Sequence, residues 1–430
     1  MKVKLLSMIL ICLLVCMNST AISAVIEQKG IPASSEYTEI DIVDIINQID
    51  EDMVYAYLEK LVSKGSRYTG TPNCTRAGVF LYHEFKKMGL KTEIHRWEFN
   101  NFKSSNIIAT IEGNDPTNDA VIIVSAHYDT TKGSLGANDD GSGIAAILAM
   151  ADALREYSFP QTIRFIAFSG EEVGLYGSFS YARDAYWRGD NIYAVLNIDI
   201  IGWAETETGG NILRFSFVDR SEWIADFATD ISEKYDEELN MRIEKIPNYR
   251  GADHQAFLDY GYDGVWIVEH DGSKYCNTPY DNLTYINKSY MYRATKLLCA
   301  ILLEMAIKPI DIQVIIEAPY EGRGYINNLP IMKTDFGKYF YQGIRGMTLI
   351  IGRADAKCMV ISKEPIKHVV FCIDNHFIQW DSNPPYEWKI KGKYLPLFGE
   401  HKLKVFAYTV SGKVAVDEMD INIYTFSFHF

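Results

Sequence analysis

The sequence has little cysteine, no excess of positive charge and few long apolar runs. Its 430 residues include seven cysteines, and none of their spacings matches a metal-binding or redox motif. Acidic residues outnumber basic ones by 56 to 42, and the formal net charge of −14 argues against nucleic acid and anionic membrane surfaces as partners. Because 48% of the residues are apolar and no tandem repeat or low-complexity segment occurs, the chain can bury a large core, and its length suits two domains.

The longest apolar stretch lies at the N-terminus and has the pattern of a secretory signal. A charged start, Met1-Lys-Val-Lys4, precedes the apolar residues 5–17 and a series of small residues that ends at Ala24. The apolar core is too short for a comfortable membrane span, and no later stretch is long and apolar enough for one. We therefore expect residues 1–24 to be a signal peptide and the mature chain to be secreted or held at the cell surface, with residues 25–39 as a linker.

Loss of that signal peptide would remove two of the seven cysteines. Five would remain, so at least one thiol would stay unpaired. Cys358 and Cys372 lie in one late β-rich segment and could form a disulfide, which the sequence alone does not decide.

The middle of the chain alternates between strand and helix patterns. Residues 121–126, 163–168 and 193–198 are apolar, β-branched runs that each end in polar residues. Between the first two, apolar residues at helical spacing over 144–154 predict a helix. Right-handed crossovers place the ends of parallel strands along one edge of a sheet, so these polar residues should converge there. For residues 40–308 we expect an α/β fold with a mixed, mostly parallel sheet flanked by helices.

From residue 310 onward the pattern changes to short alternating runs separated by turn signals. Examples are residues 312–317, 368–373 and 403–408, and no helical stretch interrupts them. This pattern predicts an antiparallel, all-β sandwich domain over residues 310–430.

The polar residues at the strand ends are of the types that bind zinc. Zinc favours imidazole and carboxylate ligands, which makes His127, Asp139 and Asp199 candidates for one site. A paired site needs one carboxylate that spans both ions, and Asp139 together with Glu172 could begin it. Glu171 would then be free to take a proton from a metal-bound water.

Each acidic residue also has a simpler interpretation. Asp139 and Asp140 could cap the helix that we expect to start at Ser142. Asp129 could be a turn residue, or it could hold the second ring nitrogen of His127. Four motifs in order at strand ends favour the metal site more strongly than any one of them does.

Five blocks of the sequence resemble, in the same order, those of the M28 family of co-catalytic zinc aminopeptidases. The blocks are Ala126-His-Tyr-Asp129, Gly136-Ala-Asn-Asp-Asp-Gly-Ser-Gly143, Gly170-Glu-Glu172, Asn197-Ile-Asp199 and Ala252-Asp-His-Gln-Ala-Phe257. The resemblance covers about residues 37–308 and implies a fold of the zinc-exopeptidase type.

The resemblance also implies a role for each candidate. His127, Asp139 and Asp199 would bind one zinc, Asp139 and Glu172 the other, and Glu171 would be the general base. Tyr249, four residues before Asp253, falls where relatives place a tyrosine whose hydroxyl supports the tetrahedral intermediate. An ordinary amphipathic surface residue is the alternative interpretation of Tyr249.

The chain departs from the family at the last ligand position. Family members usually have a histidine in a Tyr-His-Thr-Pro-like segment, whereas this chain has Asn277 there. A carboxamide oxygen is a weaker zinc ligand than imidazole, so we expect one ion, with a second weakened on the Glu172 side. His270 could in principle replace the missing ligand but is more simply an exposed loop histidine. His254 follows the family's Asp-His pair and is not a ligand there.

The C-terminal residues 369–374, 384–388 and 401–408 resemble an immunoglobulin-like module that many exported microbial enzymes carry. This second resemblance implies surface attachment or a protein partner. The M28 resemblance implies an exported, metal-dependent exopeptidase that hydrolyses the N-terminal peptide bond of peptides through a metal-activated water. Two alternatives stay open: a catalytically impaired binding ectodomain of the same fold, and an acyl transferase similar to glutaminyl cyclase.

Overall fold

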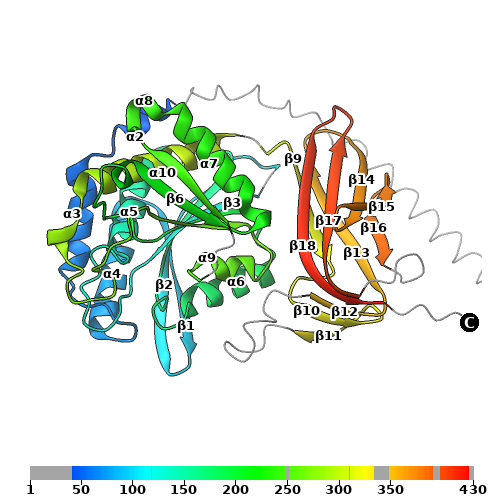
Figure 1. Cartoon of the computed structure of the whole chain (residues 1–430), viewed down its shortest axis with the longest axis horizontal. Coiled ribbons are helices and arrows are strands. Elements are labelled where there is room, and N and C mark those ends of the chain that lie inside the picture. The colour runs from blue at the N-terminus through cyan, green and yellow to red at the C-terminus, as the bar shows by residue number, and fades with distance from the viewer. Residues whose placement is uncertain are drawn as a thin grey trace, which may run out of the picture. The chain divides into compact units, whose positions relative to one another are not determined.

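The computed structural model describes residues 41–117, 119–247, 251–308, 310–333, 348–390 and 398–425. The expected signal peptide, the expected linker and Tyr249 lie outside these ranges. Helices and strands alternate in the first part of the chain, and strands alone follow in the second (Figure 1). The predicted fold class, α/β followed by all-β, is confirmed.

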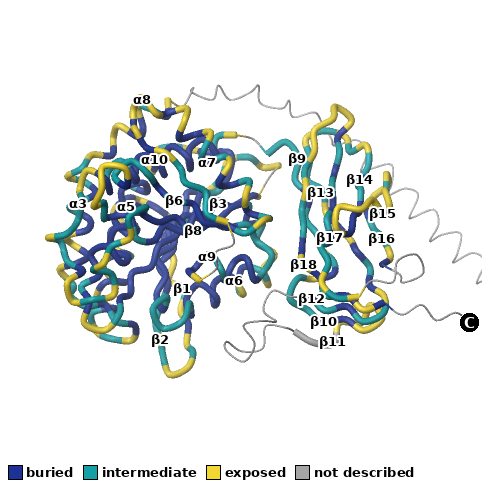
Figure 2. The backbone as a smooth tube through the Cα atoms, viewed as in Figure 1, coloured by how far each residue is buried: buried dark blue, intermediate teal, exposed yellow. Residues whose placement is uncertain are grey.

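The first part is built on one eight-stranded mixed sheet. The strand order is β1-β2-β4-β3-β5-β8-β6-β7. The strands are β1 (Lys91–Phe99), β2 (Phe102–Ile111), β3 (Val121–His127), β4 (Thr162–Phe168), β5 (Ile192–Ile198), β6 (Ile212–Phe217), β7 (Arg242–Pro247) and β8 (Gly264–Glu269). The pairs β3–β4, β3–β5, β5–β8 and β6–β7 are parallel, and the other three pairs are antiparallel. Central β3 is buried along its whole length (Figure 2).

Helices flank this sheet. They are α2 (Ile42–Ile46), α3 (Glu51–Val62), α4 (Pro72–Lys87), α5 (Gly141–Leu154), α6 (Tyr176–Arg188), α7 (Glu222–Lys234), α8 (Asp236–Leu239), α9 (His254–Leu258) and α10 (Lys288–Ile307). Short 3-10 turns cover Gly209–Asn211, Asp219–Ser221 and Leu283–Tyr285. Among the helices in the described ranges, none combines the length and the apolar character needed to cross a bilayer.

Helix α5 fixes the position of one side of the site. Asp140 is its N-cap, and the side chain accepts a hydrogen bond from the N–H of Gly143, which satisfies a donor that the helix leaves free. Every residue of α5 except Asp152 is buried, because the helix packs against α3, α10 and β3. The N-terminal end of α5 is therefore held rigidly against the end of β3.

The second part consists of two sheets around one core. The seven-stranded sheet has the order β11-β10-β12-β18-β17-β14-β15 and the three-stranded sheet the order β16-β13-β9. The strands are β9 (Ile312–Ala318), β10 (Arg323–Ile326), β11 (Leu329–Lys333), β12 (Thr348–Ile351), β13 (Ala354–Ser362), β14 (Ile366–Ile373), β15 (His376–Asp381), β16 (Tyr386–Ile390), β17 (Phe398–Thr409) and β18 (Val414–Tyr424). Buried side chains from both sheets, such as Ala356 and Phe371, form one cluster, as in a sandwich.

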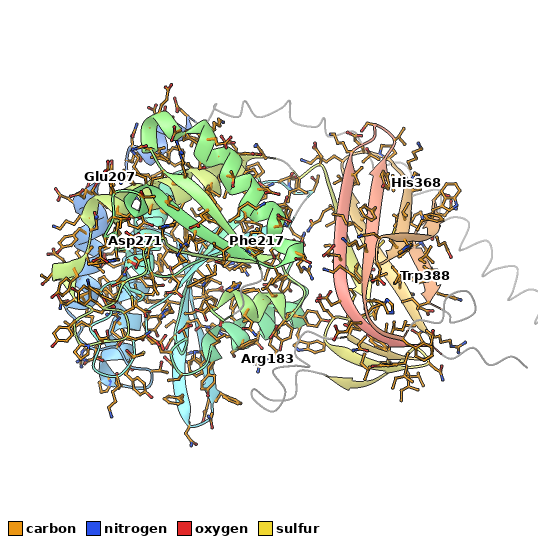
Figure 3. All side chains as sticks on the ribbon, viewed as in Figure 1. Arg183, Glu207, Phe217, Asp271, His368 and Trp388 are labelled. Carbon is orange, nitrogen blue, oxygen red and sulfur yellow. The ribbon has the colours of Figure 1, made fainter. Side chains whose placement is uncertain are left out.

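One detail of this part differs from the sequence-based expectation, and one open question is answered. The pairs β10–β12 and β12–β18 are parallel, so the sandwich is not wholly antiparallel. Cys358 and Cys372 are both free, buried thiols, so the disulfide that the sequence left open is not formed. Outside the core, His368 on β14 packs edge-on against Trp380 with ring centroids 5.7 Å apart (His368 is labelled in Figure 3).

Candidate metal centre

Three neighbouring parallel strands end at the same edge of the eight-stranded sheet. In this sheet β3 lies between β4 and β5. His127 is the last residue of β3, Asp199 directly follows β5, and Glu171 and Glu172 lie in the turn after β4. Asp139 lies just before α5. The sheet order thus brings side chains that are far apart in the sequence to one place.

The structure groups His127, Asp139 and Asp199. Their ligand atoms lie within 4.8 Å of one another, and all three residues are buried. The Nε2 atom of His127 is 3.3 Å from Oδ1 of Asp139 and 3.6 Å from Oδ1 of Asp199. Oδ2 of Asp199 accepts a hydrogen bond from Nε1 of Trp266 (2.9 Å), whereas its buried Oδ1 has no hydrogen-bond partner among the described residues. A buried carboxylate oxygen without a donor is costly unless a cation compensates it.

This group fits a zinc ion. Zinc binds imidazole nitrogen and carboxylate oxygen at about 2.0–2.2 Å in a tetrahedral arrangement, which separates neighbouring ligand atoms by roughly 3.3 Å. The separations from His127 Nε2, 3.3 and 3.6 Å, are of this size. Three protein ligands leave a fourth position free, as is typical of catalytic rather than structural zinc sites.

Asp129 supports the site in a different way from the one expected. The Nδ1 atom of His127 lies 3.1 Å from the main-chain oxygen of Asp129 and 3.7 Å from its carboxylate. The carboxylate accepts the N–H groups of Glu171 (3.2 Å) and Glu172 (3.3 Å) and the hydroxyl of Thr69 (2.6 Å). Asp129 therefore orients His127 mainly through its main chain, and the two glutamates through its side chain.

Asp140 caps α5, as its simpler interpretation predicted, and it also has a second role. Besides the N–H of Gly143 (2.9 Å), its fully buried carboxylate accepts the N–H of His127 (3.0 Å) and the N–H of Ile200 (3.2 Å). One side chain thus joins the end of β3, the end of β5 and the start of α5. Each of these three segments carries one residue of the group, so Asp140 fixes their mutual positions.

The turn that carries Glu171 and Glu172 is also held by Asn106. The Oδ1 atom of Asn106 accepts the N–H of Ser169 (3.2 Å), and its Nδ2 donates to the main-chain oxygen of Gly177 (2.9 Å). Asn106 is fully buried, so these bonds are shielded from water. They join the two ends of the turn.

The two glutamates differ in their contacts. Glu171 is partly buried, and removal from water raises the pKa of its carboxyl well above the ordinary value, against the opposing charge of His127. Glu172 does not belong to the group of three; its Oε1 accepts the N–H of Thr131 (3.1 Å), and burial raises its pKa to about 8.

The remaining sequence candidates lie outside the group. Asn277 is exposed in a turn, with a left-handed φ of 62°. His270 is only partly exposed, because its Nδ1 pairs with Oε2 of Glu244 at 2.7 Å. His254 is buried on α9 and does not belong to the group of three. The structure does not describe Tyr249.

Sequence reasoning missed a buried network behind Asp139. The carboxylate of Asp281 accepts the N–H groups of Asn138 (2.8 Å) and Asp139 (3.0 Å). The side-chain amide of Asn138 donates to both oxygens of Glu269 (3.1 Å each) and accepts the N–H of Gly202 (2.7 Å). Asp281 stands in the segment that carries the family resemblance, but nothing in its spacing showed which atoms it would bind.

The α/β sheet of this order, with its flanking helices, has a fold of the zinc-exopeptidase type. Residues 106–302 match the family model described as peptidase family M28. The chain therefore contains an M28 peptidase domain, and the resemblance seen in the sequence is confirmed for that domain. The immunoglobulin-like character of the C-terminal part stays a prediction.

Known proteins with similar sequences and structures agree with this assignment. The chain is 27% identical over 285 residues to a probable zinc metalloprotease of Pyrenophora tritici-repentis, covering 53% of this chain and 65% of that protein. It is 28% identical over 216 residues to aminopeptidase YwaD of Bacillus subtilis, covering 49% of this chain and 46% of that protein. A solved zinc aminopeptidase from Bacillus subtilis matches with a TM-score of 0.55 at 18% identity, over 61% of this chain and 96% of that one. The last comparison shows the fold.

Proposed function

We propose that the chain is a metallo-aminopeptidase that hydrolyses the N-terminal peptide bond of peptides. The observation that carries this proposal is the buried group of His127, Asp139 and Asp199, with Glu171 in the adjacent turn. The M28 domain and the aminopeptidases among the similar proteins support the same activity.

The residues of the chain would divide the work as follows. Zinc, when bound by His127, Asp139 and Asp199, supplies the Lewis acidity that polarises the scissile carbonyl and activates water. Glu171 takes the proton of the attacking water and returns it to the leaving amine. The bond from the N–H of Glu171 to Asp129 (3.2 Å) fixes the main chain from which the base projects.

We also propose that the chain holds one zinc ion tightly and a second one weakly. Glu172 lies in the turn after β4, at the sheet edge where Asp139 lies, but outside the group of three. Asn277 offers only a neutral oxygen at the position of the usual histidine, and its side chain is exposed. The free amino group of a substrate would then be bound less firmly than by a complete second site.

The test combines metal content with hydrolysis of an aminoacyl anilide, compared with its N-acetylated form. We expect zinc in the purified chain, cleavage of the free form only, and loss of cleavage with a chelator. Glu171→Gln should keep zinc and lose activity by about 10²- to 10⁴-fold. Glu207→Gln, at an exposed position outside the group of three (Glu207 is labelled in Figure 3), is the matched control and should behave as wild type.

Two results would contradict the proposal. A metal-free, inactive preparation would favour the binding ectodomain. Cyclisation of a peptide with an N-terminal glutamine, without hydrolysis of the anilide, would favour the acyl transferase. Among the described residues, the buried Oδ1 of Asp199 has no hydrogen-bond donor, which speaks against the first alternative because a chain with no metal has no physical reason to keep such an atom.

We further propose that the chain is exported, on the strength of the signal-like residues 1–24. The mature N-terminus, determined by mass spectrometry on protein from a secreting host, should lie near residue 25. Recovery of the uncleaved chain from inside the cell would contradict this. Attachment to a surface or a protein partner through the C-terminal part stays a proposal on the same footing.

A further inference from the structure

The connection between α3 and α4 touches the metal centre although it lies outside the family match. Residues 66–69 belong to this connection, and the match begins only at residue 106. They pack against residues 128–136, the loop that leads from His127 towards Asp139. Ser66 takes part: its hydroxyl donates to the main-chain oxygen of Thr131 (3.4 Å) and accepts the N–H of Gly133 (3.1 Å).

Arg67 binds both ends of that loop. Its Nε donates to the main-chain oxygen of Tyr128 (2.6 Å), Nη1 to that of Leu135 (2.6 Å) and Nη2 to that of Gly136 (2.9 Å). Tyr128 directly follows His127, and Gly136 lies three residues before Asp139. One planar guanidinium therefore sets the distance between the segments that carry two of the candidate ligands.

The guanidinium of Arg67 is a buried positive charge. Arg67 is fully buried, and its three side-chain hydrogen bonds all go to main-chain oxygens. Burial lowers the pKa of its guanidinium to about 10, which still leaves it charged at neutral pH. Burying a cation is costly. Three main-chain carbonyls accept the hydrogen bonds of Arg67, and the nearby carboxylates, Asp281 first, also favour its charged form. Because the guanidinium donates all three of these hydrogen bonds to one loop, it restricts the conformations of that loop more than an apolar residue of the same volume would.

Thr69 acts on the other half of the site. It is buried, and its hydroxyl donates to Oδ2 of Asp129 (2.6 Å), the oxygen that also accepts the N–H of Glu172. The hydroxyl thereby fixes the carboxylate that holds the main chain of Glu171 and Glu172. Thr71, two residues further on, is instead the N-cap of α4 and accepts the N–H of Cys74 (3.3 Å).

From these contacts we infer that Arg67 and Thr69 are positioning residues of the metal centre, Arg67 for the ligands His127 and Asp139 and Thr69 for the Glu171–Glu172 turn. The inference rests on the proposed function. It extends the working site into a segment that the family match does not include.

The test compares each variant with a matched control in the full chain. Arg67→Lys keeps the charge but cannot reach three carbonyls, and we expect its zinc dissociation constant, measured by competition with a chromogenic chelator, to rise by about 10- to 100-fold. Arg164→Lys is the control: Arg164 is a half-buried arginine of β4 that donates to Tyr181 (2.6 Å) and Asp190 (3.0 Å). It should lower Tm and leave zinc affinity unchanged.

Thr69→Val and Thr71→Val form the second pair. Both lose a hydroxyl from the same connection, and Thr71→Val should lower Tm through loss of the helix cap. Only Thr69→Val should speed hydrogen exchange at the N–H groups of Glu171 and Glu172, which is read in the metal-free protein and does not depend on activity. Thr69→Ser should restore wild-type exchange.

The outcomes separate this inference from the proposed function. If the wild-type chain binds no zinc, the proposed metal centre is wrong, and this inference is wrong with it. Wild type that binds zinc, with Arg67→Lys unchanged in affinity, overturns the role of Arg67 alone. If Arg67→Lys does not fold, the threonine pair decides: equal exchange in Thr69→Val and Thr71→Val overturns the inference, and faster exchange in Thr69→Val supports it.

Discussion

Gly177→Ala should damage both the stability of the domain and the turn that carries the proposed base. Gly177 lies in the first turn of α6, directly against the start of the Glu171–Glu172 turn. A Cβ atom at this position would lie 2.1 Å from the main-chain oxygen of Ser169 and 2.4 Å from Oδ1 of Asn106. An ordinary carbon–oxygen contact is about 3.3 Å or more, so the two segments would have to separate by about 1 Å.

The magnitude follows from these contacts. Overpacking of a dense interior costs about 1–3 kcal/mol of stability. Because the Cβ added by Gly177→Ala lies so close to main-chain atoms, we expect a cost at the upper end of this range. The shift also weakens the two hydrogen bonds of Asn106 to Ser169 and Gly177, each worth about 1 kcal/mol. Alanine recovers up to about 1 kcal/mol of helix propensity. The net loss is about 3 kcal/mol, which corresponds to a fall in Tm of roughly 6–12 °C for a domain of this size.

The assay is thermal unfolding of the zinc-free protein together with hydrolysis by the zinc-loaded protein. A displacement of 1 Å at a catalytic group can cost about 100-fold in rate, so we expect kcat to fall by that order. Gly189→Ala is the control, because Gly189 ends the same helix at a φ of 75° with no atom within 4 Å of its added Cβ. It should cost about 1–2 kcal/mol for the left-handed backbone and leave kcat unchanged. A Gly177→Ala protein as stable and as active as Gly189→Ala would refute the reasoning.

Three further predictions concern the metal and pH. Removal of zinc with a chelator should lower Tm, and added zinc should restore it with a dependence on its concentration, because the ion binds the folded state; a Tm that ignores zinc would contradict this. Asn277→His should raise the metal content from one ion per chain to two, and two ions in the wild type would show that Asn277 does not limit the Glu172 side. Burial alone would raise the pKa of Glu304, but hydrogen bonds from Lys234 and Tyr235 outweigh it and hold the pKa below its usual value. The ionised carboxylate therefore adds stability above about pH 4.3, and this stability is lost as pH falls. Unfolding curves of wild type and Glu304→Gln should differ at pH 7 and converge near pH 3. A difference in stability that stays the same at both pH values would refute the role given to the ionised Glu304.

The sequence predicted the elements that rest on strong local patterns. The apolar runs at 121–126, 163–168 and 193–198 became β3, β4 and β5, and the crossover rule alone was enough to expect their ends side by side. The grouping of His127 with Asp199, 72 residues apart, follows from that topology.

The contacts that orient these residues could not be predicted in the same way. Whether Asp129 meets His127 through its carboxylate or its main chain depends on the path of a loop, and no periodicity encodes that path. Arg67 stands in a connection without any motif, and its three carbonyl partners come from another loop. The parallel pairing of β12 with β10 and β18 likewise depends on which strands meet across the sheet rather than on alternation within a strand.

The buried bonds of Asp140 and Asp281 bear on when the protein can acquire its ion. Asp281 must reach back to Asn138 and Asp139 across more than 140 residues, and Asp140 must meet Ile200. During synthesis, the hydrogen bonds that position the metal centre therefore cannot all form until almost the whole domain has left the ribosome. An ion would be captured by a finished fold, so a shortage of zinc should yield folded, inactive molecules that can be rescued later.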